Sequence, residues 1–411
     1  MSSFSAPLSG LLANTKALNI VGDNLANMNT QGFKGNTVLF EDAMGQANAS
    51  LQIGDGVGST LTERDFSQGT LQTTNGPLDA AIQGNGFFVV QTPSGETMYS
   101  RDGSFSLNSG GQLVTSTGNL VQGWMATNGV ANPSGPVTDI TVPSLTPQPP
   151  AATQNMTLTA NLNAAAASGS TFSTPIQVVD SLGNTHVLTV NFTETAANSW
   201  SYDVTIPGQD LTGGTAGANT SIGTGTLKFD ASGNLTSPAA GSPVAIKTTT
   251  GLADGASDLN INWNLYNPSG AATLTQFAQT SAATGTSQDG TQPGSVTGVS
   301  LQNGGMLVAT YSNGNVATIA QVAVASVSNP DSLISVANNN YTLGVSTLTP
   351  SVGGANTGER GSIVAGSLET SNVDMATQFT NLIVFQRGYE ANSKVITTIN
   401  QMDQTLLAIQ I

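Results

Sequence analysis

The sequence predicts a multidomain, mainly β protein that has a long α-helix at each terminus. Three observations lead to this prediction. Apolar residues recur at steps of three and four in the first thirty and the last forty of the 411 residues, whereas short alternating apolar runs fill the middle. Two segments rich in proline or glycine, residues 143–150 and 285–294, interrupt that middle. Because strand-like runs return after the second segment, we expect nested, discontinuous domains, in which one β domain is inserted into another.

We expect the first helix within residues 1–30, as the N-terminal part of an inner polymerisation domain. Pro7 lies in the first turn, where proline is tolerated, and residues 29–32 end the helix with a glycine. Residues 31–78 show no clear periodicity, so we expect an extended and partly irregular connector there. The apolar residues of the helix follow the spacing of a coiled-coil seam: Phe4, Leu8, Leu11, Leu18 and Leu25.

Residues 79–145 and 285–352 are expected to form the two parts of an outer β domain. Residues 87–90 are a continuous apolar run, and Phe105 and Leu107 alternate with serines. Frequent turn signals separate these short runs, which is typical of an all-β domain.

Residues 146–284 are expected to form the inserted β domain. Residues 178–190 predict a hairpin, because two apolar runs flank a Gly-Asn turn. Strict alternation elsewhere indicates sheets with one face in water. Two strands show it most clearly, through Trp200, Tyr202, Val204 and Ile206, and through Leu259, Ile261 and Trp263.

A second connector, residues 353–370, leads to the C-terminal helix of the inner domain, residues 371–411. Residues 371–374 fit a capping box, and no proline follows. A helix from residue 374 to 409 would be roughly 54 Å long at 1.5 Å per residue. Its apolar seam comprises Met375, Phe379, Leu382, Tyr389, Ile396, Ile399, Met402 and Leu406.

Five of the last six residues are apolar, so we expect this terminus to need a partner that buries it. We expect the two terminal helices to pair as a coiled coil and to pack with other subunits. The alternative is that both helices dock on their own globular body.

Composition narrows the class of function. A charge of −15 disfavours binding to nucleic acid or to an anionic membrane, and no apolar run is long enough to span a membrane. The charged fraction of 8% is far below the roughly 25% of soluble domains, and a surface rich in Thr and Asn suits an extracellular protein. Without cysteine there are no disulfides, and without a secretory signal peptide we expect a dedicated export route.

No constellation of residues predicts chemistry, so we expect no catalytic, cofactor-binding or metal-binding residue and no enzyme. His186 is the single histidine, and on a strand it would close an apolar face as a structural residue. A zinc site or a catalytic triad would need partners that the composition scarcely supplies. Residues 230–234 resemble the start of a calcium loop, but Leu235 and Gly241 stand where such a loop needs Gly and Glu, so we expect a turn.

Two features of the helices stay open at this stage. Arg387 and Glu390 have the spacing of a solvated surface pair, and a contact with another subunit is the alternative. Gly22 and Gly388 lie inside helices, either as flexible points or at places where two helices approach closely.

Both ends of the chain also carry a family resemblance. Residues 24–34 resemble the N-terminal signature of bacterial flagellar rod and hook proteins, and residues 366–374 and 386–392 resemble the C-terminal signature of that axial protein family. Residues 180–186 and the inserted domain are similar to hook members rather than rod members. The matching motif residues are Asn24, Asn27, Thr30, Gly32, Phe33, Leu368, Ser371, Asn372, Val373, Gln386 and Asn392.

The resemblance implies a structural subunit of the bacterial flagellar hook, an extracellular part of the flagellum. Such a subunit self-assembles into a curved, flexible tube that joins rod to filament and transmits motor torque as a universal joint. The implied partners are identical subunits, rod, hook-cap and hook–filament junction proteins, and the flagellar type III export apparatus, without nucleic acid or membrane insertion. The alternatives are a distal rod protein with an enlarged domain and, from another class, an extracellular β-rich binding module.

Overall fold

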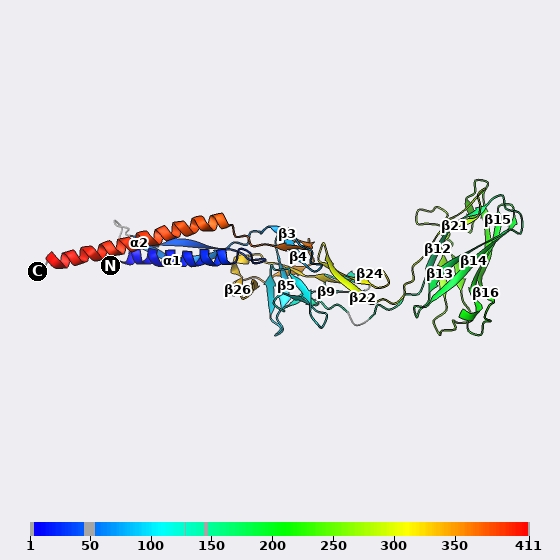
Figure 1. Cartoon of the computed structure of the whole chain (residues 1–411), viewed down its shortest axis with the longest axis horizontal. Helices are drawn as coiled ribbons and strands as arrows, with labels where there is room; N and C mark the ends of the chain where they lie inside the picture. The colour runs from blue at the N-terminus through cyan, green and yellow to red at the C-terminus, as the bar shows by residue number, and fades with distance from the viewer. Residues whose placement is uncertain (1–3, 45–53, 128, 144–146, 410–411) are drawn as a thin grey trace. The chain divides into compact units, whose positions relative to one another are not determined.

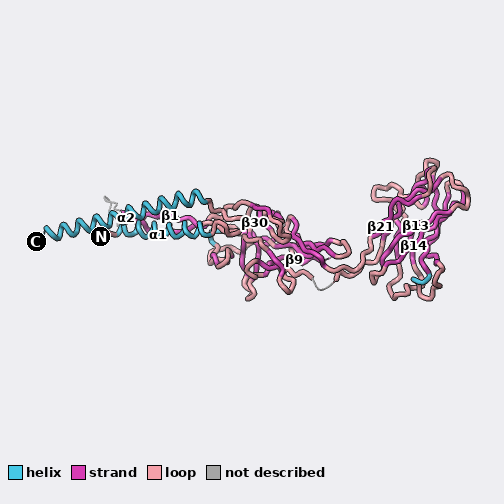
Figure 2. Tube along the Cα trace, viewed as in Figure 1, coloured by secondary structure: helices cyan, strands magenta, loops and turns pink. Residues whose placement is uncertain are grey.

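The computed structural model describes residues 4–44, 54–127, 129–143 and 147–409. It confirms a multidomain, mainly β fold with a helix at each terminus, and Figure 2 shows that the rest of the described chain consists almost entirely of strands and loops. The chain divides into two compact units. Unit 1 comprises Met1–Val142, Gly298–Ala309 and Val316–Ile411, and unit 2 comprises Pro143–Thr297 and Thr310–Asn315.

Helices α1 (Ser5–Ala26) and α2 (Met375–Ile409) lie side by side in unit 1 (Figure 1). Asp374 caps α2, because its Oδ1 accepts a hydrogen bond from the Thr377 N–H at 2.8 Å. Hydrogen bonds from Thr377 also lower the pKa of Asp374. The predicted capping box was therefore wrong in placing the cap at Ser371, because Asp374 is the residue that caps the helix. Ser371 lies outside the helix and accepts a hydrogen bond from the Val373 N–H at 3.3 Å.

A β-hairpin covers part of α1, although the sequence predicted no regular structure there. Strands β1 (Asn36–Met44) and β2 (Gly54–Arg64) pair antiparallel. Register shifts between Phe40 and Asp42, and between Asp42 and Met44, interrupt the alternation that would have revealed β1. Strand β2 carries three glycines, which weaken its strand pattern further.

The β part of unit 1 is built on one sheet of fourteen short strands, continued by two small antiparallel pairs. The pairs are β3 (Leu71–Thr73) with β30 (Ser367–Glu369), and β4 (Ala80–Gln83) with β29 (Ser362–Ala365). The strands of the sheet are β5 (Phe87–Gln91), β6 (Thr97–Ser100), β7 (Phe105–Leu107), β8 (Leu113–Thr115), β9 (Leu120–Thr127), β10 (Val130–Ala131), β11 (Thr138–Asp139), β22 (Val296–Gln302), β23 (Met306–Tyr311), β24 (Val316–Val322), β25 (Val324–Ser326), β26 (Ile334–Val336), β27 (Asn340–Thr342) and β28 (Ser351–Gly353), with the short helix η2 (Pro330–Ser332) before β26.

Three aromatic rings form the centre of the core beneath this sheet. Phe66 lies edge-on to Phe87 at 5.7 Å, and Tyr341 lies 5.5–5.6 Å from both. The guanidinium of Arg101 stands over the Phe87 ring at 5.1 Å, and that of Arg64 over Tyr341 at 5.2 Å. These cation–π contacts link the core to the buried charges described below.

Unit 2 consists of two five-stranded sheets that share one hydrophobic core. The predicted hairpin is β13–β14, and the predicted inward face of β15 is buried. One sheet contains β13 (Thr171–Val179), β14 (Thr185–Ala196), β15 (Ser199–Pro207), β16 (Asn219–Phe229) and β17 (Leu235–Ser237), with η1 (Gly208–Asp210) after β15; the other contains β12 (Asn155–Asn163), β18 (Val244–Lys247), β19 (Asn260–Trp263), β20 (Leu274–Phe277) and β21 (Ala282–Gln288).

Strand β21 corrects the boundary expected at residue 285. It pairs antiparallel with β12 from Ala282 to Gln288, so the segment predicted as a linker begins inside a strand of unit 2. The side chains of β21 are small and mostly exposed, and they contain no alternating large apolar residues. A strand that adds only backbone hydrogen bonds leaves no periodic signal in the sequence.

Replacing Trp263 by Ala should destabilise unit 2. The Trp263 side chain is fully buried, and its ring packs edge-on against Tyr202 at 5.3 Å and Phe192 at 6.1 Å. The cavity should lower the free energy of unfolding by about 3–5 kcal/mol. Denaturant unfolding of the full chain, with Phe277→Ala as the exposed aromatic control from the same sheet, measures this. Equal losses in both variants would contradict a core centred on Trp263.

Candidate subunit interface

Helices α1 and α2 run antiparallel and approach closely through small residues. A Cβ atom on Gly388 would lie 2.6 Å from Oδ1 of Asn14, and one on Gly10 would lie 2.9 Å from Nδ2 of Asn392. Further along, Asn24 Nδ2 donates to Oε1 of Gln378 at 3.2 Å. Gly388 therefore marks a close helix approach, which is one of the two alternatives that its position in the sequence left open.

The buried stripe of α1 is not the predicted leucine seam. Its buried residues are Pro7, Gly10, Ala13, Ala17, Val21 and Asn24, and they repeat at steps of three and four. The side chain of Leu8 is 48% exposed, and Phe4, Leu11, Leu18 and Leu25 are half-buried. Small residues thus face α2 and the β1–β2 hairpin, and the larger apolar side chains lie on the rest of the helix surface. Gly22 lies on this open side, because a Cβ added there would have no neighbouring atom within 4 Å.

The predicted seam of α2 divides into two sets. Leu382, Ile396 and Ile399 are half-buried, as is Phe385, whose ring lies 5.9 Å from Phe40 of β1. The exposed set comprises Met375, Phe379, Tyr389, Met402 and Leu406. The chain's own contacts therefore use only part of this apolar surface.

The C-terminal end of α2 extends beyond α1 (Figure 1). Asn392 of α2 lies opposite Gly10 of α1. Because the helices run antiparallel and α1 begins at Ser5, five residues before Gly10, α1 reaches only about five residues past Asn392 along α2. The last turns of α2 have no part of α1 beside them. Met402 and Leu406 are each 60% exposed, and they line a shallow groove with Thr398, Gln401 and Thr405.

A buried ionic cluster lies where the chain leaves α1 and enters α2. Glu369 Oε1 accepts from Lys34 Nζ at 2.7 Å, and its Oε2 accepts from Arg101 Nη1 at 3.3 Å. The Gly69 N–H also donates to Oε1, at 2.9 Å, and Lys34 donates to the Ser67 carbonyl at 2.6 Å. Burial lowers the pKa values of Lys34 and Arg101, although Glu369 opposes both shifts.

Two motif asparagines hold the neighbouring segments in place. The Asn24 side chain donates to the Asn36 carbonyl at 2.8 Å and accepts from the Asn36 N–H at 2.9 Å. Asn372 accepts from the Gly35 N–H at 2.8 Å and donates to the Asp65 carbonyl at 2.8 Å. These contacts hold Asn372 outside α2, together with its neighbours 371 and 373. The helix is therefore capped by Asp374 and not by Ser371, the residue that the capping box predicted.

The other motif residues support the same junction or lie on α2. Gly32 adopts a φ of +66°, donates to the Glu369 carbonyl at 2.8 Å, and has no room for a Cβ against the Arg101 backbone. The side chains of Thr30 and Asn27 hydrogen-bond at 3.2 Å. Phe33 and Leu368 are buried, Val373 packs against Gly35, Gln386 donates to Glu390 at 3.2 Å, and Asn392 is half-buried opposite Gly10.

Arg387 and Glu390 form no ion pair in the described chain, where Glu390 accepts from Gln386 instead. None of the helices in the described residues has the length and apolar character needed to cross a membrane.

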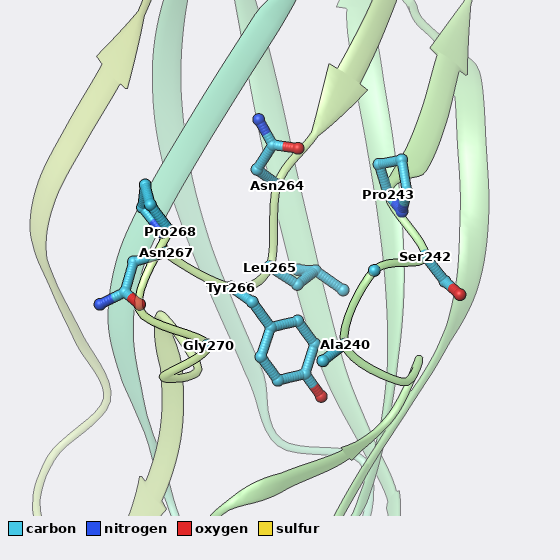
Figure 3. A pocket seen from close by; sticks show the side chains of 10 residues that line it. Ala240, Ser242, Pro243, Asn264, Leu265, Tyr266, Asn267, Pro268 and Gly270 are labelled. Carbon is cyan, nitrogen blue, oxygen red and sulfur yellow. The ribbon is translucent and has the colours of Figure 1, made fainter.

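A pocket in unit 2 lacks side chains that could act in catalysis or bind a metal (Figure 3). Asn264, Tyr266 and Asn267 line it together with prolines, glycines and other small residues, and no carboxylate, amine or imidazole is among them. The Tyr266 hydroxyl donates to the Pro238 carbonyl at 2.8 Å, so its proton is already used.

His186 has more polar partners than its sequence context suggested. Its Nδ1 lies 3.1 Å from Oδ2 of Asp210, and its Nε2 lies 3.0 Å from Oδ2 of Asp180. Burial would lower the pKa of His186, but the hydrogen bonds to these carboxylates outweigh burial and raise it. Burial would raise the pKa of Asp180, but hydrogen bonds, chiefly with Asp254 and His186, lower it to about 2.

Four family matches define the class of the protein. Residues 7–34 match "Flagella basal body rod protein", residues 81–161 "Flagellar hook protein FlgE/F/G D1 domain", residues 148–291 "Flagellar basal body protein FlaE D2 domain", and residues 364–409 "Flagellar basal body rod FlgEFG protein C-terminal". These matches place the chain among the flagellar rod and hook proteins.

Full-length relatives narrow the class further. The flagellar hook protein FlgE of Salmonella typhimurium is 32% identical over 99% of this chain and 100% of its own length, and that of Treponema pallidum is 31% identical over the whole of both chains. The chain belongs to the flagellar hook protein FlgE family. The crystal structure of Helicobacter pylori flagellar hook protein FlgE2 shares the fold, with a TM-score of 0.53 at 13% identity over 73% of this chain and 100% of that one.

Replacing Glu369 by Gln should destabilise unit 1, because Lys34 and Arg101 would keep buried charges without a counter-charge. Breaking such a network by removing one partner costs about 3–5 kcal/mol. Denaturant unfolding measures the loss in the free energy of unfolding, and monitoring it at two wavelengths tests whether the transition is two-state. The exposed Glu359→Gln is the matched control, and its effect should stay within about 0.5 kcal/mol. A loss for Glu369→Gln no larger than the control's would contradict the role of the cluster.

Proposed function

We propose that this protein is a structural subunit of the bacterial flagellar hook, which self-assembles with identical copies into a curved, flexible tube. The tube joins the rod to the filament and transmits motor torque as a universal joint. The observation that carries the proposal is the apolar end of α2, which extends past α1 and exposes Met402 and Leu406. Apolar side chains grouped in this way favour burial against another protein surface.

In this proposal the helix pair forms the inner wall of the tube. The small-residue stripe of α1 holds α2 as a coiled coil within each subunit, and the exposed apolar sets contact neighbouring subunits. Residues 1–30 and 371–411 then form the inner polymerisation domain, with connectors at 31–78 and 353–370. Residues 79–145 and 285–352 form the outer β domain, and the inserted domain starts at 146 and extends past 284 to include β21.

The β units serve as the moving contacts of the joint. A bent tube that rotates about its own axis must let outer contacts slide once in each turn. The charged fraction of 8% supports this, because surfaces without strong ion pairs have no deep energy wells to leave. Opposite-charge pairs placed on these surfaces would resist the sliding.

The remaining partners follow from the place of a hook in the flagellum. We propose contacts with rod proteins at one end, with hook–filament junction proteins at the other, and with a cap during growth. Export unfolded through the flagellar type III apparatus accounts for an extracellular location, and the function requires no enzymatic activity.

Replacing Met402 and Leu406 together by Asp should abolish polymerisation. Burying each side chain contributes roughly 1.5–3 kcal/mol, and an unpaired buried carboxylate costs several kcal/mol more. The losses recur in every subunit. Sedimentation and electron microscopy under polymerising conditions measure assembly, and thermal unfolding measures the fold of the monomer.

The matched control is Asn400→Asp, which places a new charge on the opposite side of the same helix. It should assemble as the parent chain does, and neither variant should shift the melting temperature. Normal tubes from the double variant would disprove the role of the α2 end. A large fall in melting temperature would instead show that this end docks on its own chain.

Removing residues 150–292 should leave assembly intact but abolish regular curvature. The backbones of Gln148 and Gly294 already exchange two hydrogen bonds, at 2.7 and 3.3 Å, so an Asn-Gly turn between Pro149 and Pro293 can close a hairpin there. The helices and the outer β domain remain. Electron microscopy of the polymers distinguishes straight or irregular tubes, which we expect, from regularly curved ones, which would refute this role for the inserted domain.

A further inference from the structure

One cluster of titratable side chains lies outside the proposed assembly surfaces. His186 is the second residue of β14, and Asp180 precedes the turn that connects β13 to β14. Asp210 ends η1, and Asp254 lies in the loop between β18 and β19. The side chain of Asp180 is fully buried and that of His186 is 7% exposed, whereas Asp254 is accessible to solvent. The cluster therefore joins loops of both sheets of unit 2.

The imidazole is held so that one nitrogen faces two carboxylates. Asp210 Oδ2 lies 3.1 Å from Nδ1, which fixes the ring. On the other side, Nε2 lies 3.0 Å from Oδ2 of Asp180 and 3.7 Å from Oδ2 of Asp254. A histidine that is oriented through Nδ1 by a carboxylate is a common arrangement around protein-bound metals.

The spacing of these three atoms suits a tetrahedral ion. Ligands bound at 2.0–2.1 Å in a tetrahedron stand about 3.3 Å apart. The two measured separations from Nε2 lie on either side of that value, and all three atoms fall within 4.8 Å of one another. Only a small adjustment would bring them to equal distances from one centre.

Hydrogen bonds fix the orientation of both carboxylates. Oδ1 of Asp180 accepts from the N–H groups of Leu182 and Asn184 at 2.8 and 2.9 Å. Oδ1 of Asp254 accepts from the Ala256 N–H at 3.0 Å, and its Oδ2 accepts from Nδ2 of Asn184 at 2.9 Å, which leaves a second lone pair of that oxygen for an ion. In both residues Oδ2 is the oxygen directed at His186, so the donors are arranged before any ion arrives.

The charge balance also favours a cation. Three carboxylates surround one imidazole, and within the described residues no lysine or arginine forms an ion pair with any of them. The carboxyl groups therefore outnumber the basic groups around them by three to one. A divalent cation would supply positive charge where the chain itself supplies little.

We propose that Asp180, His186 and Asp254 bind a divalent transition-metal ion of the Zn²⁺ class, with Asp210 as the positioning residue. One imidazole and two carboxylates form a mixed nitrogen and oxygen ligand set, which suits Zn²⁺ better than Mg²⁺. The fourth position opens to solvent beside Asp254 and is filled by water. The ion ties the β13–β14 turn to the loop before β19, and so holds the two sheets of unit 2 together.

The chain contains its own control for this site. Asp230 sits in a turn of the same form, where its Oδ1 accepts from the N–H groups of Ser232 and Asn234 at 2.8 and 2.9 Å. The residue six positions on, which is His186 in the first turn, is the exposed Thr236 in the second. A turn of this shape without a histidine should not bind the ion.

Isothermal titration of the full-length, tag-free chain with ZnCl₂, after treatment with EDTA and its removal, tests the proposal. We expect one saturable Zn²⁺ per chain, and no saturable binding of MgCl₂ at the same concentrations. Asp254→Asn should weaken Zn²⁺ binding at least tenfold, and because Asp254 is accessible this variant should still fold. His186→Gln should do the same, Asp210→Asn should weaken binding 10–100-fold, and Asp230→Asn should bind as the parent does.

X-ray absorption at the zinc edge provides a second readout, with one imidazole and oxygen ligands expected. The absence of saturable Zn²⁺ binding would overturn the proposal. So would parent-like affinity in Asp254→Asn, or an equal loss in Asp230→Asn, which would indicate non-specific attraction to an acidic protein.

Discussion

A single buried carboxylate holds together segments that are more than three hundred residues apart. Glu369 binds Lys34 from the N-terminal region and Arg101, which directly follows β6, and its backbone carbonyl accepts from Gly32. Burying three charges carries a large desolvation penalty, so the cluster is stable only when all three segments are in place. In the folded chain, the cluster thus joins both ends of the sequence to the β domain at the point from which α1 and α2 extend side by side.

The sequence predicted those elements whose side chains alternate or repeat against a core. Strands β13, β14 and β15 and both terminal helices belong to this group, because a buried face leaves a periodic pattern. The β1–β2 hairpin and β21 escaped prediction for the opposite reason. Bulges interrupt β1, and the side chains of β21 bury almost nothing, so backbone hydrogen bonds alone define it. The helix itself was expected from residue 374 and begins at Met375, but the first residue of the capping box was misplaced at Ser371, because Asn372 makes contacts with residues that are distant in sequence.

Prediction of the candidate sites from the sequence failed for a different reason. An apolar stripe can be read from a sequence, but not which molecule covers it. On α1 the chain's own contacts use Ala13 and Ala17, whereas Leu8 remains exposed, although the leucines gave the stronger pattern. At His186 the difficulty was sequence distance. Asp254 lies 68 positions away and reaches the histidine only because two sheets are folded together, so no local motif could reveal it.

The small residues between α1 and α2 also determine how far apart the two helices lie. Glycine at positions 10 and 388 lets the two helices approach until an added Cβ would collide with the side chain of Asn392 or Asn14 on the opposite helix. A pair packed in this way is narrower than one separated by leucines. If copies stand side by side around a channel, the thickness of each pair fixes how many fit into a given circumference. The bore of the resulting conduit would then depend on the absence of two side chains.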